Sequence, residues 1–231
     1  MKWIAALAAL ASATAAQAQS YQCRMPQVTS APSVTRDAPE RQMPVTGYTL
    51  ALSWSPEFCK GREGQRAQAL QCSGRNGRFG FVVHGLWPDG ARGWPQWCAT
   101  TQRPTGAQVA GQLCRSPSTR LVARQWAKHG SCMVRFPRTY YRVTNILYDS
   151  LRWPDFDRLS RKEELTAGDV RDWFVAANRG WRHDAVGVKL NARGWLQELR
   201  LCYDRRFMPA RCDRARFGPK DAASVKIWRG L

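Results

Sequence analysis

Histidine is scarce in this sequence of 231 residues, which contains only three. No Cys-x-x-Cys pair occurs, and no histidine stands at metal-ligand spacing from a cysteine, so we expect no structural zinc site, no other metal and no cofactor. The apolar stretch at residues 4–16 is too short to span a bilayer, and no later apolar run approaches the length that a membrane-spanning helix needs. The sequence therefore argues against a metalloprotein and against a protein embedded in a membrane.

The N-terminal residues have the layout of a secretory signal peptide. Lys2 precedes the apolar stretch, and the small-x-small triplet Ala16-Gln17-Ala18 follows it. We expect removal of residues 1–18, which leaves a secreted or periplasmic protein without a membrane anchor. Residues 19–44 are rich in Pro, Ser and Thr without apolar periodicity and predict an extended leader. Residues 45–231 then form one domain.

Acidic residues are few, since 17 Asp and Glu face 36 Lys and Arg and give a net charge of +19. An excess of this size favours a polyanionic partner, because each phosphate that a protein neutralises releases condensed counterions. The alternative is an exported protein that is basic for solubility or adhesion. Charge alone indicates a class of partner and no chemistry.

The eight cysteines all lie in the part of the chain that export would carry. An even number in an oxidising compartment predicts four disulfides, although eight cysteines allow 105 pairings. Closeness in sequence suggests that Cys59 pairs with Cys72 and that Cys202 pairs with Cys212.

Alternation of apolar and polar residues predicts strands. One is expected at residues 48–54, and a second at residues 79–84, ending at His84 before a turn at Pro88-Asp89-Gly90. Residues 59–77 between them are polar and basic, as in a surface loop. A hairpin is expected from residues 186–190 and 195–203.

Three helices are expected at residues 116–129, 138–151 and 167–177. Gly130 is placed to end the first as its C′ residue, and Thr166 with Asp169 forms a capping-box variant before the third. The polar residues at the end of the first helix share a broad face, because they recur at intervals of four: Arg124 with Lys128, and Gln125 with His129.

Two of the three histidines, His84 and His129, stand in short segments rich in Trp and Gly. Cleaving RNA without a metal requires a base for the ribose 2′-OH, an acid for the leaving 5′-oxygen and cations for the phosphorane. Histidine suits both roles, because its pKa near 6.5 allows one ring to be neutral while another is protonated. The third, His183, has no motif around it and is interpreted as a surface residue.

The two segments resemble the signatures of the ribonuclease T2 family. Residues 81–88 read Phe-Val-Val-His-Gly-Leu-Trp-Pro, against the family's Phe-x-x-His-Gly-Leu-Trp-Pro. Residues 124–132 read Arg-Gln-Trp-Ala-Lys-His-Gly-Ser-Cys, against His-Glu-Trp-x-Lys-His-Gly-x-Cys. Residues 50–56, Leu-Ala-Leu-Ser-Trp-Ser-Pro, are similar to the family's first strand. The resemblance is specific from about Tyr48 to Cys132.

By matching position, the resemblance implies that His84 and His129 are the acid–base pair, with His129 as the base and His84 as the acid. Lys128 would polarise the phosphate, while Trp87 and Asp89 would hold a base by stacking and hydrogen bonding. The family also implies a disulfide between Cys132 and a cysteine after the first segment. The implied pairs are then Cys98 with Cys132 and, from the cysteines that remain, Cys23 with Cys114.

The sequence departs from the family where Arg124-Gln125 replaces His-Glu. Gln125 takes the place of a catalytic group and keeps its reach, but an amide cannot carry a proton, whereas Arg124 can bind the phosphate of the substrate. Losing an acid and gaining a fixed cation both lower the pKa of His129. We therefore expect a slower enzyme with an acid-shifted optimum.

We expect an α+β fold, with an antiparallel sheet flanked by helices and long disulfide-bonded loops. The expected function is metal-independent cleavage of single-stranded RNA, through a 2′,3′-cyclic phosphate to 3′-phosphate ends, by a monomer. One alternative is a T2-like protein that binds RNA with weakened catalysis. The other is a basic secreted effector.

Overall fold

A computed structural model describes residues 20–230, so the expected signal peptide at residues 1–18 lies outside the described residues. The strands are β1 (Ser20–Tyr21), β2 (Gly47–Trp54), β3 (Arg78–Phe79), β4 (Phe81–Asp89), β5 (Val186–Leu190) and β6 (Leu196–Tyr203). The α-helices are α1 (Ser55–Cys59), α2 (Ala69–Cys72), α3 (Gly106–Ala110), α4 (Thr119–Lys128), α5 (Pro137–Asp149), α6 (Phe156–Leu159), α7 (Ala167–Ala177) and α8 (Arg214–Phe217). Three 3-10 helices are η1 (Arg66–Gln68), η2 (Gly130–Cys132) and η3 (His183–Ala185).

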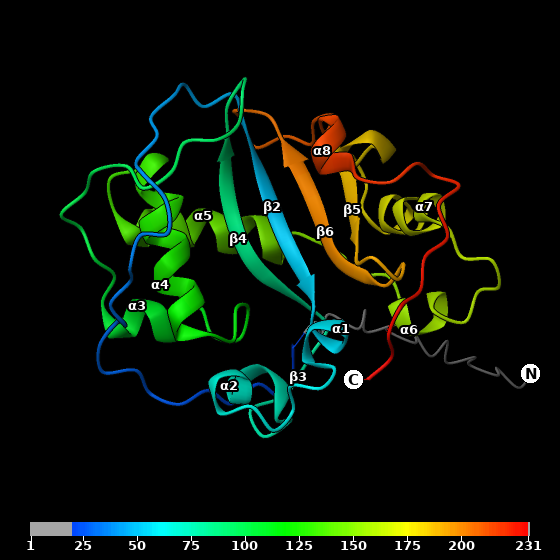
Figure 1. Ribbon diagram of the computed structural model, residues 1–231, viewed down its shortest axis with the longest axis horizontal. Helices are drawn as coiled ribbons and strands as arrows, with labels where there is room; N and C mark the ends of the chain where they lie inside the picture. The colour runs from blue at the N-terminus through cyan, green and yellow to red at the C-terminus, as the bar shows by residue number, and fades with distance from the viewer. Residues whose placement is uncertain (1–19, 231) are drawn as a thin grey trace, which may run out of the picture.

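A four-stranded antiparallel sheet in the order β4-β2-β6-β5 forms the centre of the fold, and β1 pairs with β3 in a small second sheet. In Figure 1, α5 passes behind the central sheet, α7 lies beside β5, α3 and α4 lie on the side of β4, and α1 and α2 lie at the lower end of the sheet. The expected α+β class, with an antiparallel sheet and helices, is therefore confirmed. Among the described residues, no helix is long and apolar enough to cross a membrane.

The two faces of the central sheet differ in chemistry. Leu50, Leu52 and Trp54 of β2 are buried in the core, and Leu201 and Leu199 of β6, which pair with Leu50 and Leu52, continue this apolar face. The alternate residues point to the other side, where Ser53 pairs with Glu198 and both line a cavity. The period-two alternation of strands thus separates a core face from a polar face.

The expected strand ending at His84 is wrong in its extent. Strand β4 continues to Asp89, and the chain reverses only between Gly90 and Gly93, which form a bridge. Pro88 is tolerated within the strand because β4 is at the edge of the sheet, where a missing N–H leaves no ladder bond unmade.

His84 occupies a β-bulge. Ala51 pairs with Gly85 and Leu52 with Val83, so His84 is the extra residue of β4. A bulge leaves its extra residue unpaired and re-aims its side chain. The side chain of His84 lines the cavity on the polar face of the sheet, and the preceding residue, Val83, is buried on the core face.

The outer edge of β4 is held by side chains and loops in place of another strand. The hydroxyl of Tyr140 accepts from the Leu86 N–H at 3.2 Å and donates to the Leu86 carbonyl at 3.1 Å. The Tyr148 hydroxyl donates to the Phe81 carbonyl at 2.8 Å, and the Val83 N–H donates to the Arg115 carbonyl at 2.7 Å. These bonds fix the strand that carries His84.

Helix α4 begins at Thr119, three residues later than expected, because the side chain of Ser118 accepts from the Leu121 N–H and caps it. Gly130 is not a C′ residue in the left-handed region, since the chain continues directly into η2. A Cβ on Gly130 would lie 2.6 Å from the Trp126 ring and 2.7 Å from the Tyr140 ring. Glycine is needed there for close packing.

Helices α5 and α7 and the β5–β6 hairpin lie within a few residues of their expected places, and Thr166 with Asp169 forms a capping box on α7. The expected surface loop at residues 59–77 instead contains α2 and η1. Four disulfides join Cys23 to Cys114, Cys59 to Cys72, Cys98 to Cys132, and Cys202 to Cys212, which are the pairs named above.

Candidate active site

The side chain of His84 on β4 is held by a carboxylate from β6, and β2 lies between these two strands. Its Nδ1 lies 2.8 Å from Oε1 of Glu198 on β6, whose side chain is only 7 % exposed. The other oxygen of Glu198 lies 3.3 Å from Arg200 and 3.5 Å from Lys189. Although burial opposes ionisation, the hydrogen bond to His84 and the neighbouring cations lower the pKa of Glu198 to about 2.

An ionised Glu198 accepts a hydrogen bond from a protonated Nδ1 of His84, which fixes the ring and leaves Nε2 available for proton transfer. Sequence reasoning missed this residue. One feature of the sequence could have indicated it: Glu198 is the one acidic residue in the strand Leu196–Tyr203. Since Leu199 and Leu201 of this strand face the core, Glu198 falls on the opposite, polar face.

The indole of Trp87 is in contact with both imidazoles. Its ring centroid is 5.2 Å from that of His84 in an edge-on arrangement and 5.7 Å from that of His129. Strand β4 and the end of helix α4 therefore bring together the two histidines that the sequence singled out, and both contact the same aromatic ring.

His129 caps α4 and is 7 % exposed. Burial first, and then the charges of Lys128, His84 and Arg124, lower its pKa to about 3. The direction agrees with the sequence-based expectation, but the largest cause is burial, which the sequence does not display. Nδ1 of His129 is buried and has no hydrogen-bond partner within residues 20–230. Its imidazole is therefore neutral at neutral pH.

Gln125 holds the indole of Trp87. Its Oε1 accepts from Trp87 Nε1 at 2.8 Å, and the side chain is buried. Gly85 makes this approach possible, because a Cβ at that position would lie 2.0 Å from Gln125 Oε1. In this arrangement the amide positions Trp87, and its assignment as a catalytic group stays a prediction.

Arg124 and Lys128 contact the leader, and Arg124 also lines the cavity beside His84. Both form ion pairs with Asp37, and Lys128 Nζ lies 3.0 Å from Asp37 Oδ2. Trp97 Nε1 donates to Asp37 Oδ1 at 2.9 Å. The hydrogen bond from Lys128 lowers the pKa of Asp37 to about 2, so the carboxylate is ionised.

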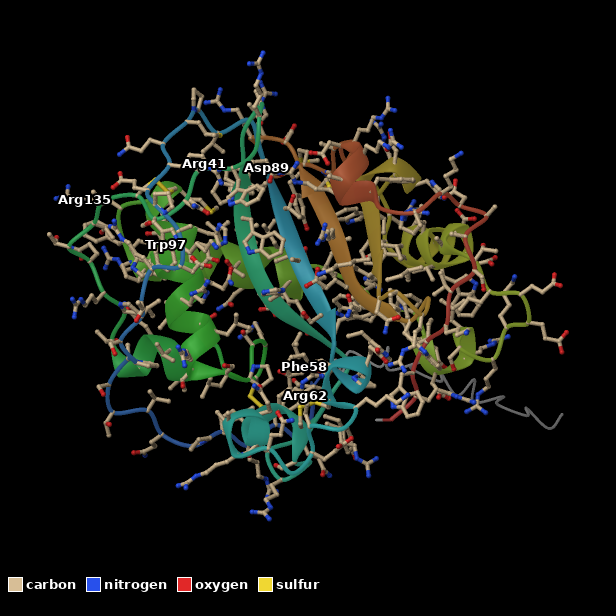
Figure 2. The ribbon with its side chains drawn as sticks, viewed as in Figure 1. Arg41, Phe58, Arg62, Asp89, Trp97 and Arg135 are labelled. Carbon is tan, nitrogen blue, oxygen red and sulfur yellow. A yellow bond between two sulfur atoms is a disulfide. The ribbon has the colours of Figure 1, made fainter. Side chains whose placement is uncertain are left out.

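Asp37 was also missed, because the leader carries no recognisable motif. It forms ion pairs with both cations that the sequence assigned to the phosphate of a substrate, and its single negative charge offsets one of their two positive charges. In Figure 2, Trp97 lies beside this segment of the leader, on the side of the molecule where α4 is found. The Cys98–Cys132 disulfide ties the Trp97 loop to the end of that helix.

Asp89 lies at the upper end of β4 in Figure 2. Its carboxylate forms an ion pair with Arg216 and accepts from Thr49 Oγ1 at 2.8 Å. Burial raises its pKa despite these partners. Binding of a nucleobase by Asp89 stays a prediction, and a base would share the carboxylate with Arg216 and Thr49.

The expected site residues thus form three neighbouring groups. His84, Trp87, Gln125 and His129 lie together; Arg124 and Lys128 lie at the leader; and Asp89 lies further along β4. His183 is about a third exposed and lies 3.5 Å from Asp172 and Asp221. Among the described residues, no cluster of three or more His, Cys, Asp or Glu side chains could hold a metal ion.

This arrangement can move protons at a phosphate ester. One neutral imidazole can accept a proton, a second ring held by a carboxylate can donate one, and adjacent cations can stabilise negative charge. The polar face of the sheet beside His84 opens into a cavity large enough for parts of a polymeric substrate.

Comparison with known proteins points in one direction. A model of the ribonuclease T2 family matches residues 46–163, which include both histidine segments. A protein named "Probable ribonuclease" from Haemophilus influenzae is 33 % identical over 182 residues, covering 73 % of this chain and 61 % of that protein. A "Ribonuclease" from Aeromonas hydrophila is 42 % identical over 85 residues, covering 37 % of this chain and 36 % of that one. The alignments thus span less than two thirds of either relative.

The fold has solved counterparts. The structure of an RNase-related protein from Calystegia sepium superposes with a TM-score of 0.60 at 19 % identity. The match covers 81 % of this chain and all of that one. At this identity the likeness concerns the fold alone.

Proposed function

The chain belongs to the ribonuclease T2 family, and from this membership we propose that it is an endoribonuclease that cleaves single-stranded RNA without a metal. The 2′-OH attacks the adjacent phosphorus, the bond to the 5′-oxygen breaks, and a 2′,3′-cyclic phosphate forms. Water then opens this ring to a 3′-phosphate. The observation that carries the proposal is the pair of imidazoles that both contact Trp87.

His129 is the base in the first step. Its lowered pKa keeps the ring neutral, so a nitrogen lone pair is available to take the proton of the 2′-OH. His84 is the acid that protonates the leaving 5′-oxygen. Glu198 at Nδ1 orients His84 so that Nε2 is the atom that transfers the proton.

Lys128 and Arg124 stabilise the charge that develops on the phosphorane, as cations beside a transferring phosphoryl group do. A phosphate that binds there must compete with Asp37 for both side chains. Trp87 and Asp89 hold a nucleobase, and stacking on an aromatic ring stabilises binding by roughly 1–3 kcal/mol per base.

Export is part of the proposal. Four disulfides are typical of secreted and periplasmic proteins and rare in reducing compartments. We expect the mature chain to start near Gln19 and to act as a monomer outside the cytoplasm.

The test is incubation of the oxidised protein with RNA and with DNA in the presence of EDTA. Cleavage of RNA alone, with cyclic phosphate ends, supports the proposal. His84→Ala and His129→Ala should each abolish turnover, and an undiminished rate in either variant removes that residue from the mechanism.

A second candidate is a T2-like protein that binds RNA and turns it over poorly. It is favoured by Gln125, an amide at the position of the family's acid, and by Asp37, which occupies the phosphate-binding cations. Retention of RNA without cleavage in the same experiment would support this candidate.

A further inference from the structure

A cavity of about 730 Å³ lies in front of the polar face of the central sheet. Ser53, Val82 and His84 line it on the side of the sheet. Its other lining residues come from three segments that are distant in sequence: residues 57–71 after β2, residues 118–124 at the start of α4, and residues 189–198 of the β5–β6 hairpin. His84 therefore belongs both to the candidate active site and to this cavity.

The cavity is strongly basic. Six cationic side chains line it, against the two carboxylates of Glu57 and Glu198. The six are Lys60, Arg62, Arg120, Arg124, Lys189 and Arg193. Glu198 is turned to His84, and Glu57 Oε1 accepts from Asn191 at 2.7 Å.

Several of these cations are held without a carboxylate. Lys60 Nζ lies 3.5 Å from the ring centroid of Trp228, and the Arg62 guanidinium lies 4.9 Å from that of Phe58. Cation–π contacts fix a cation without cancelling its charge. Figure 2 places Phe58 and Arg62 at the end of the sheet opposite Asp89.

Arg120 and Arg193 are exposed, and neither forms an ion pair within residues 20–230. They stand on separate walls of the cavity, one on α4 and the other in the turn of the hairpin. Basic residues that serve only to keep a surface solvated would not need to line a cavity or to lie beside a histidine of the candidate active site. These residues do both. The positive potential inside the cavity is therefore focused beside His84, the group that would protonate the leaving oxygen.

We propose that the cavity binds the sugar-phosphate backbone of the RNA strand beyond the cleaved linkage. This inference rests on the proposed function and extends it, because it makes the protein selective for a polymer over a dinucleotide. The strand passes from Trp87 and His84 along the polar face, and its phosphates are bound by Arg120 and Arg193. Phe58 offers a ring on which a base can stack.

The experiment compares two double variants that each remove two positive charges. Arg120→Ala/Arg193→Ala alters the cavity. Arg158→Ala/Arg179→Ala is the control, because both of its side chains are exposed and lie outside the cavity lining. Thermal unfolding followed by circular dichroism checks that both variants fold.

Binding is measured with a 2′-O-methyl RNA decanucleotide, which lacks the free 2′-OH needed for cleavage. The Kd of the cavity variant should rise about tenfold relative to the control. The slope of log Kd against log salt concentration should fall by about 0.7 for each phosphate that the variant no longer neutralises. Equal affinity and equal slope in the two variants would overturn the inference.

Cleavage of unmodified RNA separates this inference from the proposed function. If the wild-type protein cleaves RNA, the ratio of kcat/KM for a decanucleotide to that for a dinucleotide should fall in the cavity variant and not in the control. An equal ratio in both variants contradicts the inference while leaving the proposed function intact. A wild-type protein that cleaves no RNA contradicts the proposed function, and the Kd comparison still judges the cavity.

Discussion

Glu198 and His84 are 114 residues apart in sequence, yet their side chains meet at 2.8 Å on the polar face of the sheet. The carboxylate is buried, and its pKa of about 2 keeps it ionised at any pH at which the protein would act. Glu198 is thus a positioning residue for His84.

Glu198→Gln should lower kcat by about 10- to 100-fold, the range found when a hydrogen-bonding partner that orients a metal-ligating histidine is lost. The amide of the variant can accept a hydrogen bond from Nδ1–H, as the carboxylate does, but its NH2 group can also donate one to an unprotonated Nδ1. The variant therefore also allows the tautomer of His84 that carries its proton on Nε2. Nitrogen NMR of His84 should show a mixture of tautomers in the variant and Nδ1–H alone in the wild type at a pH where the ring is neutral.

The conservative variant Glu198→Asp retains the charge and should recover part of the rate. A purely structural role for Glu198 would change stability in both variants and leave the His84 tautomer as it is in the wild type. That pattern would rule out the positioning role.

Gln125→Glu should raise kcat and move the limb of the pH–rate profile that reports His129 to higher pH. The carboxylate can still accept the hydrogen bond from Trp87 Nε1, and its charge raises the pKa of the neighbouring imidazole. The measurement is a profile of kcat/KM between pH 3 and pH 8. Gln27→Glu, which adds the same charge to an exposed position in the leader, is the control. No gain in rate and no movement of the limb would count against a role for position 125 in proton transfer.

Asp37→Asn should strengthen the binding of phosphate, because Lys128 and Arg124 lose the carboxylate that competes for them. The pair is partly exposed, so the gain should be modest, about fivefold for a contribution near 1 kcal/mol. Inhibition by a 3′-nucleotide provides the measurement. Asp172→Asn removes one exposed acid elsewhere and should leave the inhibition constant unchanged. If the two variants behave alike, Asp37 does not compete with the phosphate.

Stability should fall in acid because His129 is buried. The unfolded chain binds a proton at this histidine below pH 6.5, whereas the folded chain does so only near pH 3. Its contribution to stability is therefore complete above pH 6.5 and is lost as the pH falls from there toward 3, by up to about 1.4 kcal/mol per pH unit.

Urea unfolding of the wild type and of His129→Gln at pH 7, 5 and 4 isolates this contribution, since other titrating groups are common to both proteins. The difference in the free energy of unfolding should shrink as the pH falls. A difference that stays constant from pH 7 to pH 4 would mean that His129 is not desolvated.

The sequence was informative where structure depends on local pattern. Hydrophobic periodicity places α5, α7 and the β5–β6 hairpin, because each of these elements buries one face that its own residues define. The capping box of Thr166 and Asp169 could be recognised because it involves four consecutive residues.

The rest depends on partners that are distant in sequence. The bulge at His84 exists only relative to Ala51 and Leu52, so the pattern of β4 alone suggested a strand that ends there. Asp37 reaches Lys128 across 91 residues, and Glu198 is separated from His84 by more. Such contacts follow from topology and register, which one sequence does not display.

The leader has a consequence for the order of folding. It is synthesised before the segments that hold it, since Cys23 pairs with Cys114 and Asp37 pairs with residues of α4. Closing a loop of this length is entropically costly and must wait for the body of the domain. The charge that opposes Lys128 and Arg124 is therefore added late, when oxidation of Cys23 and Cys114 tethers the leader, and formation of this disulfide becomes a step that sets the final electrostatics of the site.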